Sequence, residues 1–385
     1  MKKKHLLLCT ILLFICCSER EKVDRVGKKD YTMEVQPYKR FLLDKNTTQE
    51  TPYVQLFTIN DTLRFTMYNS AGHNILVYDI ASGTVVDSIT LHVEGPDNVG
   101  KNIFGYCICT MDSVYLYDYW QYTLIQVNRR GEIIRRINLS EKFLQPTEDC
   151  IVPASPYPRT DAPVRMTKGN SIILQGMGGN TGECEHPVCM VTALYSLSDS
   201  TVQFANPYPE VYGDHKKIVD SWGVFSYREV FYDLNNRDEM IVSFPADDHI
   251  VVYDVSSGDT RRFFAGYSAK DRILPVQGRS MAADLMHYME QTQYAGVFFD
   301  PYRNLYYRLV AHPLYDYDVN DRETWKKKLS VVILDSRFNK TGEYDLEEWT
   351  DRCSRTFVSE EGLHIGVVSE DDDYLKFITL KPVKL

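Results

Sequence analysis

The stretch HNILVYDIASG at residues 73–83 decides the fold, because the chain repeats it as DHIVVYDVSSG at residues 248–258. In both copies a run of aliphatic residues and one tyrosine leads to an aspartate, Asp79 or Asp254, and then to a Ser-Gly turn. Aliphatic β-branched and aromatic residues favour strands, and a repeated strand-and-turn unit indicates a fold built by adding similar units. The sequence therefore predicts an all-β chain with the architecture of a β-propeller.

The same order of strands and Gly-bearing turns returns along the chain and predicts six blades. Seven blades stay open as the alternative, because insertions blur the repeat length. Blade six is short by one strand, and a strand at residues 31–43 would complete it, close the ring and protect an edge. The predicted strands are TLRFTMY, HNILVYDI and TVVDSITL in blade one; SVYLYDY, YTLIQVN and EIIRRINL in two; SIILQGM, VTALYSLSD and TVQFANP in three; EMIVSFP, DHIVVYDV and TRRFFAG in four; NLYYRLVAH, LSVVILDS and TGEYDLE in five; and GLHIGVVSE and YLKFITLKP in six.

Three aspartates occupy one place in this repeat, directly after an apolar run. They are Asp79, Asp254 and Asp335. An aspartate at the start of a turn accepts hydrogen bonds from the turn's own backbone. We therefore predict that these residues close hairpins and carry no chemistry.

One segment breaks the strand pattern. Residues 280–293, SMAADLMHYMEQTQ, place apolar side chains at Met281, Leu285, Met286 and Met289. Spacings of four and three are typical of an amphipathic helix. We predict a short helical insertion here that packs on one rim of the propeller.

The first residues form a predicted signal peptide, residues 1–16, with a basic start and a short apolar run. Residues 14–19, FICCSE, resemble a bacterial lipoprotein lipobox in its loose Bacteroidetes form. That resemblance implies cleavage before a lipid-modified cysteine, and we predict Cys17 as the attachment site. Cys16 is one alternative, and an ordinary signal peptide is another.

Composition and the blade pattern predict the domain boundaries, and the lipobox resemblance predicts a location. Residues 17–30 are charged and form a tether, and residues 31–385 form a single propeller domain. The lipid would anchor the chain in the outer membrane, on its periplasmic or its cell-surface face. The membrane is thus the first predicted partner.

Two further motifs carry a family resemblance. EGPDNVG at residues 94–100 and FFDPYRNLYYRL at residues 298–309 resemble the Bacteroidetes six-bladed, TolB-like β-propeller lipoproteins of unknown function. The resemblance implies the fold and the cell-envelope location. It supplies no catalytic residues.

The cysteines suggest a disulfide framework, which an exported chain would permit. Cys184 and Cys189 lie in one Gly-rich loop and are the predicted disulfide. A zinc site with His186 is the alternative, although it lacks a fourth ligand. Cys107 and Cys109 would point to the same face of a strand. A bond from one of them to Cys150 is one prediction, and free, buried cysteines at these three positions and at Cys353 are the alternative.

Several classes of function are excluded or disfavoured. The formal net charge is −10 and no basic stripe occurs, which argues against nucleic-acid binding. The motifs GxSxG, HExxH, GxxxxGK[ST] and GxGxxG after a strand are all missing. We therefore predict no catalytic residue, no metal and no cofactor.

Aromatic loops are the best binding candidates, since exposed aromatic rings beside acids suit sugar stacking or protein contact. The loops are residues 154–163, 206–214 and 312–321, and the individual candidates are Trp120, Tyr302, Arg303 and Arg308. We predict a binding or scaffold module for a protein or glycan partner. The alternative is a metal-dependent hydrolase or lyase that uses the central channel of the propeller.

Overall fold

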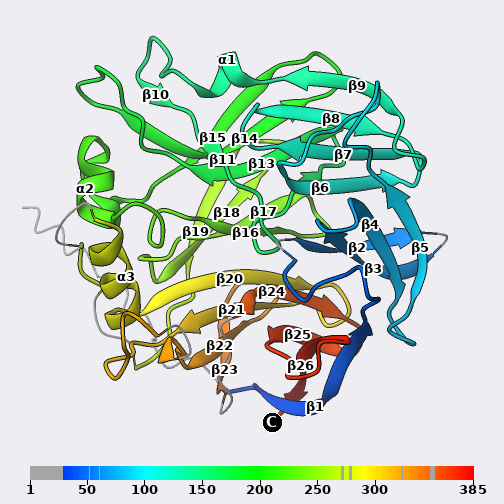
Figure 1. The fold of residues 1–385 in the computed structure, drawn as a ribbon. Helices are drawn as coiled ribbons and strands as arrows, with labels where there is room; N and C mark the ends of the chain where they lie inside the picture. Colours follow the sequence, from blue (N-terminus) through cyan, green and yellow to red (C-terminus); the bar gives the residue numbers. More distant parts are fainter. Residues whose placement is uncertain are drawn as a thin grey trace, which may run out of the picture.

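Six small sheets form a ring in a computed structural model of the protein (Figure 1). The structure describes residues 29–51, 53–59, 61–269, 273–276, 280–321, 324–346 and 352–385, and the sheets are counted over these residues. Five sheets have four strands in simple antiparallel order, as the blades of a propeller do. The prediction of an all-β, six-bladed propeller is confirmed. The predicted signal peptide, the lipid site at Cys17 and most of the tether lie outside the described residues.

The strand bounds follow the blades in chain order. They are β2 (Val54–Ile59), β3 (Thr62–Asn69), β4 (Asn74–Asp79) and β5 (Val85–Thr90) in blade one; β6 (Ile103–Thr110), β7 (Ser113–Asp118), β8 (Thr123–Val127) and β9 (Ile133–Asn138) in two; β10 (Ile151–Val152), β11 (Ser155–Pro156), β12 (Arg165–Met166), β13 (Ser171–Met177), β14 (Val188–Ser196) and β15 (Val202–Pro207) in three; β16 (Phe231–Leu234), β17 (Glu239–Ser243), β18 (His249–Asp254) and β19 (Thr260–Phe264) in four; β20 (Gln293–Asp300), β21 (Leu305–Ala311), β22 (Leu329–Leu334) and β23 (Lys340–Asp345) in five; and β24 (Arg352–Ser359), β25 (Gly362–Val367), β26 (Tyr374–Lys384) and β1 (Tyr31–Leu42) in six.

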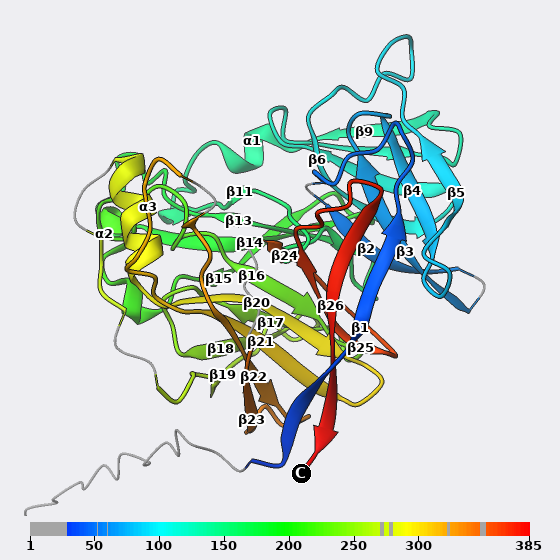
Figure 2. The same cartoon turned by 60° about the horizontal axis from the view of Figure 1, so that its bottom comes forward.

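The N-terminal strand closes the ring, as predicted. Strand β1 pairs antiparallel with β26, from Tyr31 opposite Lys384 to Leu42 opposite Tyr374. The backbone N–H of Leu385 donates to the carbonyl of Asp30 at 2.9 Å, so the two ends of the propeller meet. Figure 2 shows the first and the last strand side by side. Blade six therefore holds the start and the end of the domain together.

One strand of every blade is absent from the sequence prediction, and it is always the first. These first strands contact one another around the axis, β16 with β20, β20 with β24, and β24 with β2. Strand β20 is buried at all eight positions, so it shows no alternation of apolar and polar residues. Strand β16 has four residues, and the first strand of blade three is broken into β11 and β12. A pattern search misses such strands because burial on both faces removes the two-residue period.

The repeated aspartates close hairpins, and this prediction is confirmed. Asp79 Oδ1 accepts from the N–H of Ser82 at 2.9 Å, and Asp254 Oδ1 accepts from the N–H of Ser256 at 2.9 Å. Asp335 Oδ1 accepts from two backbone N–H groups in the same way, each at 2.8 Å. At the end of the first turn Gly83 has φ +67°, and a Cβ there would lie 2.2 Å from the carbonyl oxygen of Arg40.

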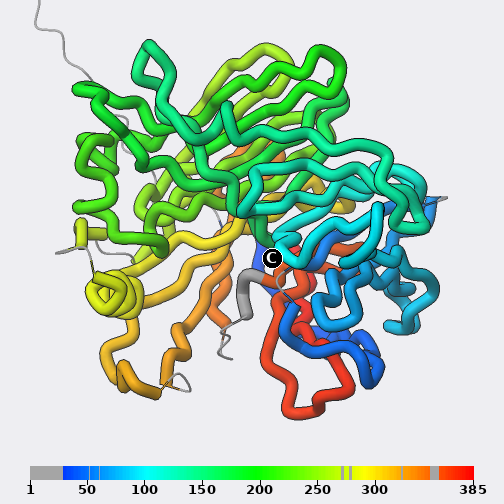
Figure 3. The backbone as a smooth tube through the Cα atoms, turned by 45° about the horizontal axis from the view of Figure 1, so that its top comes forward, coloured from blue at the N-terminus to red at the C-terminus, as the bar shows by residue number. Residues whose placement is uncertain are grey.

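The predicted insertion is helix α3 (Met281–Glu290), at the periphery of the ring (Figure 3). Ser280 caps it by accepting from the N–H of Ala283 at 3.0 Å. Met289 is fully buried, but Met281 and Met286 are exposed, so only part of the predicted stripe packs on the propeller. The other helices in the described part of the chain are α1 (Ser140–Phe143), η1 (Glu210–Tyr212), η2 (His215–Lys217) and α2 (Ile218–Trp222). Among the described helices, none has the length and apolar character to cross a bilayer.

An aromatic cluster locks the closing strand into the ring. Phe41 of β1 is fully buried and stacks on Phe65 of blade one, with ring centroids 4.0 Å apart. It also meets Phe377 of blade six edge-on at 5.8 Å. Edge-on and stacked contacts add to the free energy of burying the rings. The closure therefore rests on side-chain packing as well as on strand pairing.

We expect Phe41→Ala to lower the free energy of unfolding by about 3–5 kcal/mol, the usual cost of removing a buried phenylalanine ring. Val35→Ala is the matched control, because Val35 lies on the same strand and is 60% exposed. It should cost well under 1 kcal/mol. Urea denaturation followed by tryptophan fluorescence measures both. Equal midpoints for the two variants would show that β1 does not carry the closure.

Candidate functional site

Four aromatic rings gather where blades two and three meet. Tyr119 is their centre, with ring centroids 4.9 Å from Phe104, 5.0 Å from Trp120 and 5.3 Å from Tyr157. Trp120 is 67% exposed, and the other three rings are half-buried. We call these four residues the aromatic platform. Trp120 and the loop of residues 154–163 were separate candidates in the sequence, and the fold brings them together.

Local backbone contacts fix the platform in place. Asp118 Oδ1 accepts from the N–H of Gln121 at 3.1 Å, which shapes the turn between β7 and β8 that carries Trp120. The hydroxyl of Tyr122 lies 3.2 Å from the hydroxyl of Ser155, so this turn is joined to strand β11. A Cβ at Gly105 would lie 2.7 Å from Cβ of Pro158, so glycine is what lets the 154–163 loop pack on β6.

A charged group borders the platform. Arg159 Nε lies 3.0 Å from Asp161 Oδ1, and Arg159 Nη1 lies 2.5 Å from Glu229 Oε2. The guanidinium carbon is 5.9 Å from the ring centre of Tyr157 and 5.1 Å from that of Phe231. Burial raises the pKa of Glu229, although Arg159 opposes this shift. The edge of the platform thus offers hydrogen-bond donors and acceptors that are already held in position.

The central channel holds a pocket of about 360 Å³ near the ends of the first strands. Its charged residues are Arg165 and Asp233, whose Nη2 and Oδ1 atoms lie 3.6 Å apart. Asp233 Oδ2 also accepts from the N–H of Phe299 at 2.9 Å, so this carboxylate ties blade four to blade five. Burial raises the pKa of Asp233 against the influence of Arg165. The pocket is a polar cavity with one carboxylate that is held by its neighbours.

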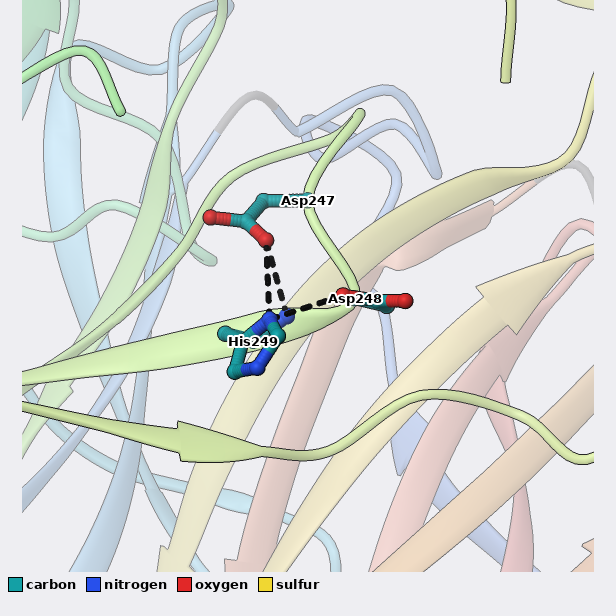
Figure 4. A group of neighbouring side chains, drawn as sticks. All are labelled: Asp247, Asp248 and His249. Carbon is teal, nitrogen blue, oxygen red and sulfur yellow. Dashed lines mark hydrogen bonds and ion pairs between the residues drawn. The ribbon is translucent and has the colours of Figure 1, made fainter. Parts of the chain in front are cut away.

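A second charged cluster lies on the turn that precedes β18 (Figure 4). His249 Nδ1 lies 3.3 Å from Asp247 Oδ1 and 2.7 Å from Asp248 Oδ1. The hydrogen bonds that the His249 ring donates to Asp247 and Asp248 raise its pKa to about 9, so the ring is protonated at neutral pH. Arg262 Nη2 lies 2.7 Å from the other oxygen of Asp247. A metal ion at these three ligands would have to displace that proton and compete with Arg262.

None of the sequence motifs singled out His249, and this cluster was missed. The signal was present, because Asp247, Asp248 and His249 are consecutive. The partner Arg262 comes from the next strand and is brought to Asp247 only by the hairpin of β18 and β19.

The four predicted ligand-binding residues do not form one site. Trp120 belongs to the platform, and Tyr302 lines the channel pocket. Arg303 uses its guanidinium on Asp300, with Nη1 3.0 Å from Oδ2, and on the carbonyl of Glu360 at 2.5 Å.

Arg308 has no exposed surface. Its Nε donates to Ser243 Oγ at 2.9 Å, and its Nη2 donates to the carbonyl of Asp247 at 2.7 Å. Its guanidinium carbon lies 3.9 Å from the ring centre of Tyr294. Burial lowers its pKa to about 10. In this conformation Arg308 supports the charged turn from beneath and does not face a ligand.

The other two aromatic loops differ in exposure. In residues 206–214, Tyr208 and Tyr212 are buried, and each hydroxyl donates to a backbone carbonyl. In residues 312–321, Tyr315 is 77% exposed. Tyr208 and Tyr212 are therefore core residues, and Tyr315 is an exposed ring. The platform differs because its rings contact one another.

The fold and these sites define a six-bladed β-propeller with half-buried aromatic and charged groups at blade junctions. The chain belongs to the DUF4221 family, a domain of unknown function, whose family model matches residues 32–345. Among curated proteins, none matches the chain.

Two of the solved structures that are similar to it come from Bacteroides species. A member of the same family from Bacteroides vulgatus is 20% identical, with a TM-score of 0.70, over 93% of this chain and 100% of that one. A protein from Bacteroides fragilis described as exported is 9% identical, with a TM-score of 0.50, over 92% and 97% of the two chains. The predicted resemblance to a propeller family of unknown function is thereby confirmed, and lipid attachment stays a prediction. The two solved structures support the fold alone.

The charged turn should make stability depend on pH. The pKa of His249 is raised from an ordinary value of about 6.5 to about 9 in the folded chain. Its contribution is complete below the lower value and is lost as the pH rises through the upper one. We expect the Tm of the protein to fall by roughly 2 °C more than that of His249→Asn between pH 7 and pH 10, a small effect because the pair is partly exposed. Parallel Tm curves in differential scanning fluorimetry would contradict this assignment.

Proposed function

We propose that this propeller is a binding module for glycans, held at the cell envelope by a lipid. The observation that carries the proposal is the aromatic platform, because it presents the exposed ring of Trp120 against Tyr119, which Phe104 and Tyr157 contact in turn. Sugars offer apolar C–H faces that pack on aromatic rings. Rings that are fixed in advance lose little side-chain entropy when they bind.

The charged border supports a saccharide over a purely apolar ligand. Arg159 lies within 3.0 Å of both Asp161 and Glu229, and its guanidinium group lies beside Tyr157. Nη2 of Arg159 is buried and has no hydrogen-bond partner among the described residues. A hydroxyl that reached it would satisfy a donor that is costly to leave unpaired. A protein partner is the second candidate, since an exposed tryptophan also suits an interface anchor.

Hydrolysis or elimination in the central channel is less well supported. General acid–base catalysis needs a side chain placed within reach of the reacting atom, and metal catalysis needs several ligands around one ion. The pocket has Arg165 and Asp233 as its charged residues, and Asp233 is held by Arg165 and by the backbone of Phe299. These contacts favour a structural or ligand-orienting role for the pair.

The envelope location is also a proposal. It is supported by the lipobox-like residues at Cys17 and by the similar Bacteroides fragilis protein described as exported. A propeller that binds glycans at the envelope would work on either face of the outer membrane.

We expect Trp120→Ala to weaken glycan binding by about tenfold or more, since 1.4 kcal/mol corresponds to a factor of ten and hot-spot tryptophans exceed that value. Tyr315→Ala is the control, because Tyr315 is at least as exposed but lies outside the platform. Affinity gel electrophoresis against soluble plant, mucin and fungal polysaccharides identifies a ligand, and titration calorimetry then compares the variants. The proposal fails if no polysaccharide retards the protein, or if both variants bind like the wild type.

Lipid attachment predicts a second outcome. In cells fed a clickable palmitate analogue, the wild-type chain should be labelled, and Cys17→Ala should lose the label. Cys16→Ala should keep it, because Cys16 then serves only as the residue before the cut. Loss of label in Cys16→Ala alone would move the anchor to Cys16, and an unlabelled wild type would remove it.

A further inference from the structure

Two loop segments of blade three run side by side near the aromatic platform. Strand β10 pairs in parallel with the start of β14, Ile151 opposite Val188 and Val152 opposite Cys189. The N–H of Val188 donates to the carbonyl of Cys150 at 3.0 Å. The end of one segment therefore lies against the loop that carries Cys184.

The cysteine side chains of these segments meet in an unexpected pair. The thiol of Cys184 is hydrogen-bonded to the thiol of Cys150, and this contact raises the pKa of Cys184. Cys189 is fully buried in the core, where its sulfur lies 3.9 Å from the carbonyl oxygen of His215. Cys107 and Cys109 contact each other on β6, so neither is the partner of Cys150.

We propose that Cys150 and Cys184 form a disulfide that staples these two segments. Both are free thiols in the structure. Cys150 is the more exposed of the two, so its thiolate attacks the disulfide of an oxidant and forms a mixed disulfide, and one thiol of the oxidant leaves. Cys184, which loses its proton to solvent, then displaces the second thiol. Two protein thiols are oxidised, and the oxidant's disulfide is reduced to two thiols.

This pairing differs from the predicted bond between Cys184 and Cys189. Cys189 is held on β14 by its strand pairing, and its N–H donates to His215 Nδ1 at 3.0 Å. Burial and the nearby Cys184 both raise the pKa of the Cys189 thiol, so these two residues are neighbours, but the thiol hydrogen bond of Cys184 goes to Cys150. Cys150 and Cys184 are therefore the better placed pair, because their thiols are already in contact.

The disulfide would restrain the platform because Cys150 precedes the platform residues in the same segment of the chain. Residues 150–152 lead directly into Ser155 and Tyr157, which position and form the platform. A bond at Cys150 would restrain that segment at one end, as the contact of Pro158 with Gly105 does at the other. The bond itself does not depend on the proposed glycan binding.

Peptide mapping without reduction tests the pairing. The reduced protein is incubated with oxidised glutathione, its remaining thiols are alkylated, and it is digested with trypsin. Cys150 falls in the tryptic peptide 143–159, and Cys184 and Cys189 share the peptide 169–216. We expect these two peptides to be cross-linked. Further cleavage after Glu185, which separates Cys184 from Cys189, should leave the cross-link on the Cys184 side.

Matched variants and a stability measurement complete the test. Cys189→Ser should still form the cross-link, and Cys150→Ser should not. Oxidation should raise the Tm of the wild type by roughly 3–8 °C and leave that of Cys150→Ser unchanged. Peptide 169–216 closed on itself, a cross-link through Cys189, or full alkylation of Cys150 after oxidation would each overturn the proposal. None of these readouts involves a glycan, so the staple and the proposed function fail independently.

Discussion

The pairing of β1 with β26 is the constraint on which the rest of the structure depends. Without it, blade six would end at β26 and expose an open strand edge, which invites pairing with other chains. The pairing joins residues from the two ends of the domain, and Phe41 carries the contact into blades one and six. In a closed ring the first strands stay packed against one another, because each blade is held between two neighbours.

Closure also explains why the aromatic platform lies at a blade junction. The third strands of the blades repeat a common pattern, and their turns satisfy their own backbones through Asp79, Asp254 and Asp335. Such turns have few groups left for a ligand. The segments that differ between blades are those that join one blade to the next, and there Tyr157 meets Tyr119 and Arg159 meets Glu229. A rigid frame thus fixes groups that are distant in sequence without ordering them at the moment of binding.

The sequence predicted the later strands of each blade but missed the first strand, which lies near the axis. It also pointed to single residues but did not show which of them form a site. Strand β4 shows its pattern because its turn and its apolar run recur in β18. Strand β20 does not, because it is buried on both faces. Trp120 and Arg308 were both candidates for ligand binding. Trp120 is exposed, whereas Arg308 has no exposed surface, because the fold places Ser243 and Asp247 around it. Composition alone gives no sign of such burial for an arginine.

The sequence by itself determined the propeller class, the closing strand, the hairpin aspartates and the helix at 280–293, because each depends on contacts between neighbours in the chain or on a repeated period. Only the tertiary structure decided which loops meet. It joined Trp120 to Tyr157, set Cys150 against Cys184, and brought Arg262 to Asp247. These pairs depend on the curvature of the ring and on the exact path of loops of unequal length. No local pattern encodes that geometry, because it arises when all six blades pack at once.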